Sequence, residues 1–472
     1  MDPEPPPESD VPPRAEPIPG DLAGATEQVP GEPPALAPAG AAALLPRLRR
    51  FARALSAYFT AQVLTQILSL SAGLVLVRTL PVREFALYTL ALSVVTFFTF
   101  VSDLGSTTSL LYFFNRTLRD GSDFALYLAA VRSLRRWAFM AGFAAVAVAL
   151  PRAAMAKGFG AAETALATAG VLLCVWFQIA ASLSVLALRL GDRYNRSYGA
   201  EIAGGGLRLA VAGTMALASR LYGWLAVLGN AAAIALTAFV ARARPALPAP
   251  AATTAPTTSR SALAPYRRRV LRYLLPTLPS ALYFSIQGPL VVWLSATFGA
   301  ARNIAEVGAL ARLGMLLGLF SNLSAIVLLP HLARIADDRL YRARFLQFGA
   351  LLAGVAAALL AVTSTFPRAF LALLGQHYSG LDSELALVAW GAGLTLVGGY
   401  LVSVNLARSW TRWQAPAMLL LAITQALLVK LLPLGTTRGV LTFNVLTGAT
   451  GMLLQAAIAG VGFARPALVH WE

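Results

Sequence analysis

The chain is poor in the side chains that most enzyme and metal chemistry requires. Its 472 residues include one cysteine, three histidines and 21 acidic residues, and only 12% of the residues are charged. A single cysteine, Cys174, cannot form a disulfide within the chain, and no Cys or His spacing of a zinc site occurs. We therefore expect no metal and no cofactor. A soluble fold is also excluded, because about a quarter of the residues of soluble domains are charged.

Hydrophobic residues make up 57% of the chain and gather in long runs. An apolar run of about 20 residues is long enough to cross a hydrocarbon layer of about 30 Å as a helix. The runs predict an all-α, polytopic membrane protein with about twelve spans. They begin near Leu55, Ala86, Leu134, Thr164, Ala200, Gly223, Tyr273, Ile304, Phe345, Glu384, Ala415 and Val440. The third is the weakest, because Arg132, Arg135 and Arg136 stand at its start and would have to snorkel.

The net charge of +17 follows the predicted topology and does not indicate a nucleic-acid partner. With the N-terminus inside, 26 basic residues fall in inner segments and eight in outer ones. The outer ones are Arg78, Arg83, Arg152, Lys157, Arg220, Arg302, Arg368 and Arg438. Basic residues concentrate in cytoplasmic loops, so both termini are expected in the cytoplasm.

Composition divides the chain into four parts. Residues 1–46 hold thirteen of the 28 prolines and eight acids, which predicts a disordered cytoplasmic tail. Residues 47–240 and 273–472 form two six-span lobes, separated by a Pro-, Ala- and Thr-rich cytoplasmic linker at 241–272. The second span opens with REFALYTLALSV and the eighth with AEVGALARLGML. We therefore expect two lobes related by a pseudo-twofold axis around a central cavity, an arrangement found in transporters.

Several stretches resemble one known family. REFALYTLALSV followed by VSDLG is similar to the amino-terminal signature of the polysaccharide transporter family, with Glu84, Phe85, Tyr88, Asp103, Leu104 and Gly105 at matching positions. This family consists of oligosaccharide-lipid flippases of the multidrug/oligosaccharidyl-lipid/polysaccharide (MOP) superfamily. YLLPTLPSALYFSIQ, LARIADD and FLALLGQHYSGLDSELALVAWG continue the resemblance over roughly residues 50–465. One departure is that GPLVVWLSATFG lacks the acid that the family often carries in its seventh span.

The resemblance implies a non-enzymatic flippase of a bacterial inner membrane. Its substrate would be an isoprenoid-pyrophosphate-linked oligosaccharide, moved by alternating access for the synthesis of a cell-surface polysaccharide. Membrane lipids and the polysaccharide assembly machinery would be its partners, and no nucleic acid is implied.

Four charged residues are predicted inside spans, where ionisable groups are costly and commonly functional: Asp103, Arg208, Arg312 and Lys430. Lys430 stands near a span end, which favours snorkelling. Arg208 either pairs with Glu201, seven residues earlier, or faces a cavity. Arg312 either joins another helix or binds the pyrophosphate that the resemblance implies, because a guanidinium binds such groups through paired hydrogen bonds.

Asp103 admits three roles. It can hydrogen-bond Ser102, Ser106 and Thr107 where a helix resumes after a break at DLGSTT, neutralise Arg208 or Arg312, or take up a proton or sodium ion. We expect almost no other acid within the membrane.

Polar side chains recur at helical spacing on the first and seventh spans. They either line the cavity and contact sugar hydroxyls or join helices. They are Gln62, Thr65, Gln66, Ser69, Ser280, Tyr283 and Gln287.

Two other functions stay open. A cation-coupled multidrug exporter of the same superfamily would favour an acidic cavity. A membrane-bound polysaccharide polymerase or glycosyltransferase would need a catalytic base or acidic pair, and usually a sizeable outer loop, whereas each predicted outer loop has about 20 residues or fewer.

Overall fold

The computed structural model of the chain describes residues 41–120, 124–191, 193–219, 221–242, 260–275, 278–333, 335 and 338–464. Residues 1–40 of the predicted tail and 243–259 of the predicted linker lie outside this range. Residues 57–472 form one compact unit, and residues 1–56 form another, of which the beginning of helix α1 is described. Every regular element in the described residues is a helix, which confirms the predicted all-α class.

Seven helices precede the predicted linker. They are α1 (Ala41–Thr79), α2 (Val82–Asp103), α3 (Ser106–Asp120), α4 (Phe124–Met155), α5 (Ala161–Leu190), α6 (Tyr194–Leu217) and α7 (Gly223–Arg242). We call the part of this group from residue 57 onward the first lobe.

The remaining helices follow. They are α8 (Arg260–Leu274), α9 (Leu278–Phe298), α10 (Ala301–Ala333), α11 (Asp338–Thr365), α12 (Pro367–Ala372), a 3₁₀ turn over Gln376–Tyr378, α13 (Asp382–Ala407), α14 (Gln414–Leu431) and α15 (Thr437–Ala464). Helices α9 to α15 make up the second lobe, and α8 occupies the end of the predicted linker.

Eleven of the twelve predicted span starts fall within a helix of 18 residues or more. The seventh, Tyr273, falls in the shorter helix α8, and the long helix α9 begins at Leu278. Within the described residues, ten helices are long and apolar enough to cross a membrane. The two other long helices are α6 and α10. The doubtful third span is α4, which has 32 residues and ample length to cross.

The break predicted at DLGSTT is present. Helix α2 ends at Asp103, and α3 begins at Ser106. Between them Leu104 and Gly105 have positive φ angles of 43° and 77°, so both adopt the left-handed conformation. The apolar sequence around Asp103 had suggested a position in the middle of a span. The structure instead places Asp103 at the end of α2.

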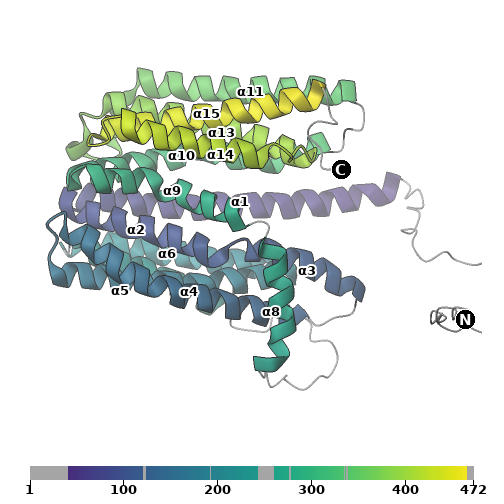
Figure 1. Cartoon of the computed structure of the whole chain (residues 1–472), viewed down its shortest axis with the longest axis horizontal. Coiled ribbons are helices and arrows are strands. Elements are labelled where there is room, and N and C mark those ends of the chain that lie inside the picture. The colour runs from purple at the N-terminus through teal and green to yellow at the C-terminus, as the bar shows by residue number, and fades with distance from the viewer. Residues whose placement is uncertain are drawn as a thin grey trace, which may run out of the picture. The chain divides into compact units, whose positions relative to one another are not determined.

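The two lobes meet through α2, α9 and α10. Figure 1 places α4, α5 and α6 on one side and α11, α13, α14 and α15 on the other, with α1, α2, α9 and α10 between them. One apolar core crosses this boundary, because buried side chains of α2 and α10, such as Leu87 and Leu310, belong to the same cluster. Helix α2 packs against both α9 and α10.

The predicted repeat is visible in two carboxylates at equivalent places. Glu84, at the start of α2, accepts a hydrogen bond of 2.7 Å from the backbone N–H of Gly223, the first residue of α7. Glu306, near the start of α10, accepts one of 2.6 Å from the hydroxyl of Thr437, the first residue of α15. In each lobe the second span thus anchors the beginning of the sixth, through the glutamate that the paired motifs REFALY and AEVGAL have in common.

Two cations join the lobes at the end where α1 stops. Arg78 donates to the carbonyls of Ala372 and Leu373 at the end of α12, over 2.7 and 2.8 Å. Lys157, in the α4–α5 connection, donates to the carbonyl of Gly299 just after α9, over 2.7 Å. We call these the two latches. Their loops were all predicted to lie on the outer side, and the structure gathers them at one end of the bundle.

Close packing between α2 and α10 depends on a glycine. A Cβ added at Gly308 would clash with the side chain of Thr89, whose own Cβ would lie 2.9 Å away. We expect Gly308→Ala to destabilise the protein by about 1–3 kcal/mol, the usual cost of overpacking. Thermal unfolding in detergent tests this. Gly354→Ala is the control, since a Cβ there meets nothing within 4 Å. Thr89→Ala removes the two nearest atoms, Oγ1 and Cγ2, but keeps Cβ, so adding it should restore part of the loss. Equal melting of all variants would contradict the expectation.

Candidate functional site

A polar cavity of about 440 Å³ lies inside the first lobe. It is lined by side chains of α1, α3, α5, α6 and α7 and is partly open. Its polar lining comprises Gln62, Thr65, Ser69, Thr107, Gln178, Ser182, Arg189, Glu201, Arg208 and Thr237. Three polar residues predicted on the first span, Gln62, Thr65 and Ser69, therefore face a cavity within one lobe. Gln66 is half-buried and is not among the residues that line this cavity.

The cavity carries one guanidinium without a carboxylate partner. Glu201 accepts a hydrogen bond of 2.8 Å from Arg189, so this acid is neutralised by α5. The predicted alternative of a Glu201–Arg208 pair is not formed. Arg208 instead donates to the hydroxyl of Ser69 over 3.2 Å, and its Nε is buried without a hydrogen-bond partner in the described structure. A positive charge is thus left available in the cavity.

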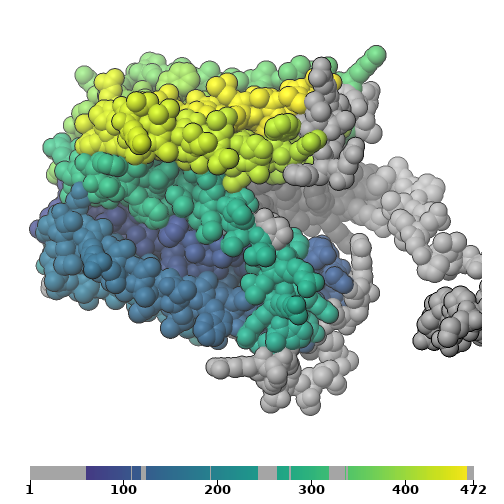
Figure 2. Space-filling model, in the orientation of Figure 1, coloured from purple at the N-terminus to yellow at the C-terminus, as the bar shows by residue number. Residues whose placement is uncertain are grey.

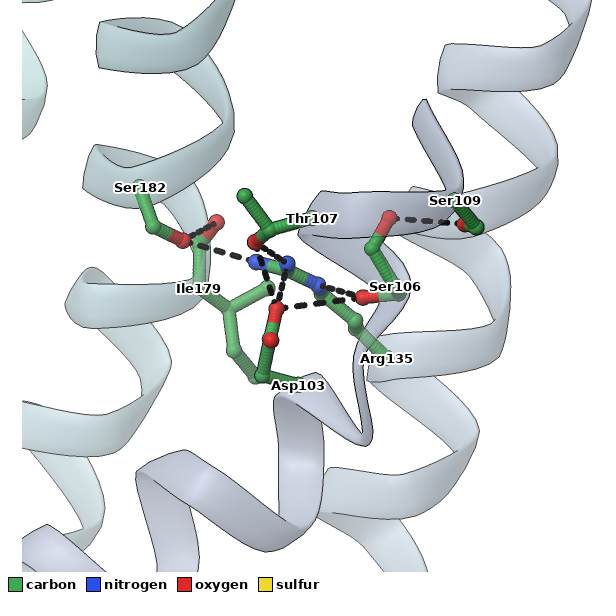
Figure 3. A network of polar contacts seen from close by, with 7 residues as sticks. All are labelled: Asp103, Ser106, Thr107, Ser109, Arg135, Ile179 and Ser182. Carbon is green, nitrogen blue, oxygen red and sulfur yellow. Dashed lines mark hydrogen bonds and ion pairs between the residues drawn. The ribbon is translucent and has the colours of Figure 1, made fainter. Parts of the chain in front are cut away.

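Asp103 does not line this cavity, and a different arginine holds it. Figure 3 shows Arg135 of α4 reaching to Asp103, Ser106, Thr107 and Ser182. Its Nη2 donates to Asp103 and, over 2.8 Å, to Thr107, while Nε and Nη1 donate over 2.7 Å to Ser106 and Ser182. Arg135 is only 3% exposed and Asp103 is 30% exposed. The expectation that Asp103 neutralises Arg208 or Arg312 is wrong, because Arg135 occupies its carboxylate.

The hydroxyl contacts predicted for Asp103 are partly present. Its Oδ1 accepts hydrogen bonds from Ser106 over 3.2 Å and from Thr107 over 2.7 Å. The hydroxyl of Ser102 has no partner in the described structure. Because Thr107 and Ser182 also line the cavity, the buried Asp103–Arg135 pair and the cavity share a wall.

Arg312 reaches from the second lobe toward α1. Its guanidinium carbon lies 5.8 Å from the ring centroid of Tyr88 on α2. A Cβ added at Gly73 of α1 would lie 3.1 Å from its Cδ. Its Nη1 approaches the sulfur of Met315 at 3.9 Å, and its Nε is buried without a hydrogen-bond partner. Within the described residues, Arg312 has no carboxylate or amide partner.

The two candidate arginines meet neighbouring turns of one helix. Arg208 contacts Ser69 and Arg312 contacts Gly73, four residues further along α1. Residues four apart share a helix face and differ by about 6 Å along the axis. One guanidinium from each lobe is therefore directed at the same face of α1, although Arg312 does not line the cavity in the first lobe.

The candidate residues on the second lobe, Tyr283, Gln287 and Lys430, do not line the cavity of the first lobe. Gln287 and Gln425 form a reciprocal amide pair between α9 and α14, with distances of 3.2 and 2.7 Å. The ring of Tyr283 meets Phe284 edge-on at 5.5 Å, and its hydroxyl is buried without a partner. Lys430 is exposed in the last turn of α14, where snorkelling was expected.

Sequence inspection missed two buried charged residues. Arg135 had been grouped with Arg132 and Arg136 as a snorkelling cation at the start of a span. Glu306 was overlooked, yet it is only 9% exposed and pairs with Arg302 at 2.8 Å. The sequence analysis did not name this buried acid, which stands near the start of α10. The match between AEVGAL and REFALY was the available signal for Glu306, since Glu84 stands at the equivalent position.

Comparison with known proteins identifies the fold. A search against protein-family descriptions and a search of curated proteins each give no match. Among solved structures, the chain is similar to the lipid II flippase MurJ in an inward closed conformation, with a TM-score of 0.66 and 14% identity over 87% of this chain and 90% of that one. It is also similar to a multidrug resistance MATE family transporter of the MOP superfamily in an inward-facing conformation, with a TM-score of 0.60 and 14% identity over 85% and 96%. The fold is that of MOP-superfamily transporters.

The MOP fold accounts for the twelve long helices as two lobes of six spans. Of the other described helices, α8 precedes the second lobe in the sequence, and α3, α8 and α12, with 15, 15 and 6 residues, are each shorter than a usual membrane span. A third similar structure is a eukaryotic MATE transporter, with a TM-score of 0.50 and 12% identity over 87% of this chain and 94% of that one.

Proposed function

We propose that this chain is a flippase that moves an isoprenoid-pyrophosphate-linked oligosaccharide across a bacterial inner membrane. The observation that carries the proposal is the placement of Arg208 and Arg312. They come from opposite lobes, lack carboxylate partners among the described residues, and contact adjacent turns of α1. Two cations in such positions suit a ligand with two linked phosphates.

The substrate explains why a protein is needed. A charged, hydroxyl-rich head is strongly disfavoured in hydrocarbon unless its charges and hydroxyls are paired. Arginine can bind phosphate oxygens through two parallel hydrogen bonds. Gln62, Thr65 and Ser69 offer further donors and acceptors for sugar hydroxyls beside Arg208. Gln66, Tyr283 and Gln287 complete the proposed path, with the buried hydroxyl of Tyr283 still unpaired.

Coupling to a cation has less support. A cation-coupled multidrug exporter needs an acid that is free to bind a proton, a sodium ion or a cationic drug. In the described part of the chain, Asp103 is paired with Arg135, Glu201 with Arg189, and Glu306 with Arg302. Each of these three acids thus has a guanidinium partner, and Glu84 accepts a hydrogen bond from the backbone of Gly223, whereas Arg208 and Arg312 have no carboxylate partner among the described residues.

Transport in liposomes tests the proposal. A labelled lipid-linked oligosaccharide is reconstituted with wild-type protein, Arg208→Gln or Arg312→Gln, and its movement between leaflets is followed over time. Loss of one hydrogen bond to a charged group, worth about 1.5–3 kcal/mol, should slow transport about tenfold to a hundredfold. Lys430→Gln is the matched control, since that side chain is exposed at a helix end.

Three outcomes would contradict the proposal. Wild-type vesicles could move no substrate, both arginine variants could match wild type, or a substrate without the pyrophosphate could move equally fast. Release of sugar products without movement of the lipid would instead favour a polymerase or glycosyltransferase.

A further inference from the structure

A second basic pocket lies outside the two lobes' shared boundary, between α4 and α8. Its volume is about 470 Å³. Arg132 and Arg136 of α4 and Arg267 of α8 line it, together with Trp137, Met140 and Leu263. None of these residues belongs to the transport path proposed above.

The arginines of this pocket have no acid to neutralise them within the described residues. Arg132 stands near the like charges of Arg136 and Arg242, and no carboxylate of the described residues forms an ion pair with it. Arg136 lies over the ring of Trp176 at 5.9 Å, a contact that leaves its charge in place. The Nε of Arg267 is buried without a hydrogen-bond partner. Three like charges around one pocket repel one another. A bound anion would reduce this electrostatic repulsion, which destabilises the protein when the pocket is empty.

Helix α8 has the character of a helix that lies in a membrane interface. Figure 1 shows its axis running across the direction of the bundle helices, and Figure 2 shows it seated on the first lobe at one end. One face is held by aromatic contacts, with Tyr266 against Tyr127 at 4.8 Å and Tyr273 against Tyr112 at 4.9 Å. Arg268 and Arg272 are exposed on the rest of the helix surface. Helices with an apolar face and an arginine-rich face associate with anionic lipid surfaces.

The side chains next to the pocket suit acyl chains. Trp137 is 66% exposed and Met140 is 60% exposed, and both stand on α4 within one turn of Arg136. Tryptophan is enriched at the level of lipid headgroups. The pocket therefore combines cations for a phosphate with an apolar surface for the attached chains, which a free anion would not use.

We infer that this pocket binds the phosphate headgroup of an anionic phospholipid in the leaflet that α8 faces. The positive-inside rule predicts that this is the cytoplasmic leaflet. Arg132 and Arg136 hold the phosphate from α4 and Arg267 holds it from α8, so the lipid fastens the helix that leads into α9 onto the first lobe.

Native mass spectrometry of the full chain tests lipid binding directly. The protein is titrated with phosphatidylglycerol and, separately, with phosphatidylcholine. Wild type should prefer phosphatidylglycerol, and Arg132→Gln/Arg267→Gln should weaken its binding about tenfold or more, the loss expected for charge-assisted hydrogen bonds. Arg268→Gln/Arg272→Gln removes the same charge from the exposed face of α8 and should change binding less than about twofold.

Several results would overturn the inference. These are equal binding of the two lipids by wild type, equal loss in both double variants, or displacement of phosphatidylglycerol by millimolar inorganic phosphate. Should the pocket variant fail to fold, a photoreactive phosphatidylglycerol on the wild-type protein decides the matter. Its crosslinks must fall on α4 or α8. Because binding is measured without transport, the result is independent of the proposed flippase activity.

Discussion

Asp103→Asn is expected to lower the free energy of unfolding by about 3 kcal/mol, near the lower end of the cost of breaking a buried ion pair. The variant keeps the shape of the side chain but leaves Arg135, 3% exposed, without its counter-charge. The lower end applies because Asp103 itself is 30% exposed. Unfolding in mixed micelles, followed by circular dichroism, measures the change.

The matched control is an exposed ion pair. Arg83 and Glu163 lie 3.8 Å apart, and Arg83 is 54% exposed. Arg83 also donates to the carbonyl of Gly158 over 2.6 Å. Because both contacts are exposed, Arg83→Gln should cost about 1 kcal/mol, well below the loss expected for Asp103→Asn. Adding Arg135→Met to Asp103→Asn removes the stranded cation and should recover at least half of the lost stability. A variant Asp103→Asn as stable as wild type would show that the carboxylate does not neutralise Arg135.

This pair marks the limit of what the sequence could predict. Most of the spans were predictable, because ten of the described helices are long and apolar enough to be recognised from hydrophobic length. The break after Asp103 was predictable too, since Gly105 and the following hydroxyl residues favour an interrupted helix. The partner of Asp103 was not, because Arg135 lies 32 residues away and stands among arginines that resemble ordinary cytoplasmic cations.

The candidate site shows the same limit. Charge in an apolar setting pointed to Arg208 and Arg312 as the cations of interest. Both arginines contact the same face of α1 because of the way α6 and α10 pack. The periodicity of the sequence gives no information about this packing. Helix α8 was not predicted, because its sequence, RSALAPYRRRVLRYL, is too basic for a span. Which of its faces is buried becomes clear from its packing against α3 and α4.

The second large effect is expected from the two latches between the lobes. Removing both, with Arg78→Ala/Lys157→Ala, should favour separation of the lobes at that end by about 2 kcal/mol, which is roughly a thirtyfold shift in population. Arg78 caps the end of α12 and Lys157 caps the end of α9, so each contact joins one lobe to the other. Arg78 is exposed and Lys157 is half-buried, which keeps each contribution modest.

Pulsed electron paramagnetic resonance can measure this shift. Cys174 is fully buried, so spin labels attach selectively to introduced cysteines. Labels at Met155 and Phe366, which are 48% and 59% exposed, report on the end with the latches. Labels at Leu271 and Leu340, 51% and 47% exposed, report on the opposite end.

The expected pattern is reciprocal. In the latch variant the distance between labels at Met155 and Phe366 should lengthen, and the distance between Leu271 and Leu340 should shorten. This follows if the proposed flippase works by alternating access, in which one end opens as the other closes. Arg152→Ala/Arg368→Ala removes the same charge from exposed residues nearby that make no hydrogen bond across the lobes in the described structure. If this control moves both distances as far as the latch variant does, surface charge and not the capped helix ends holds the lobes together.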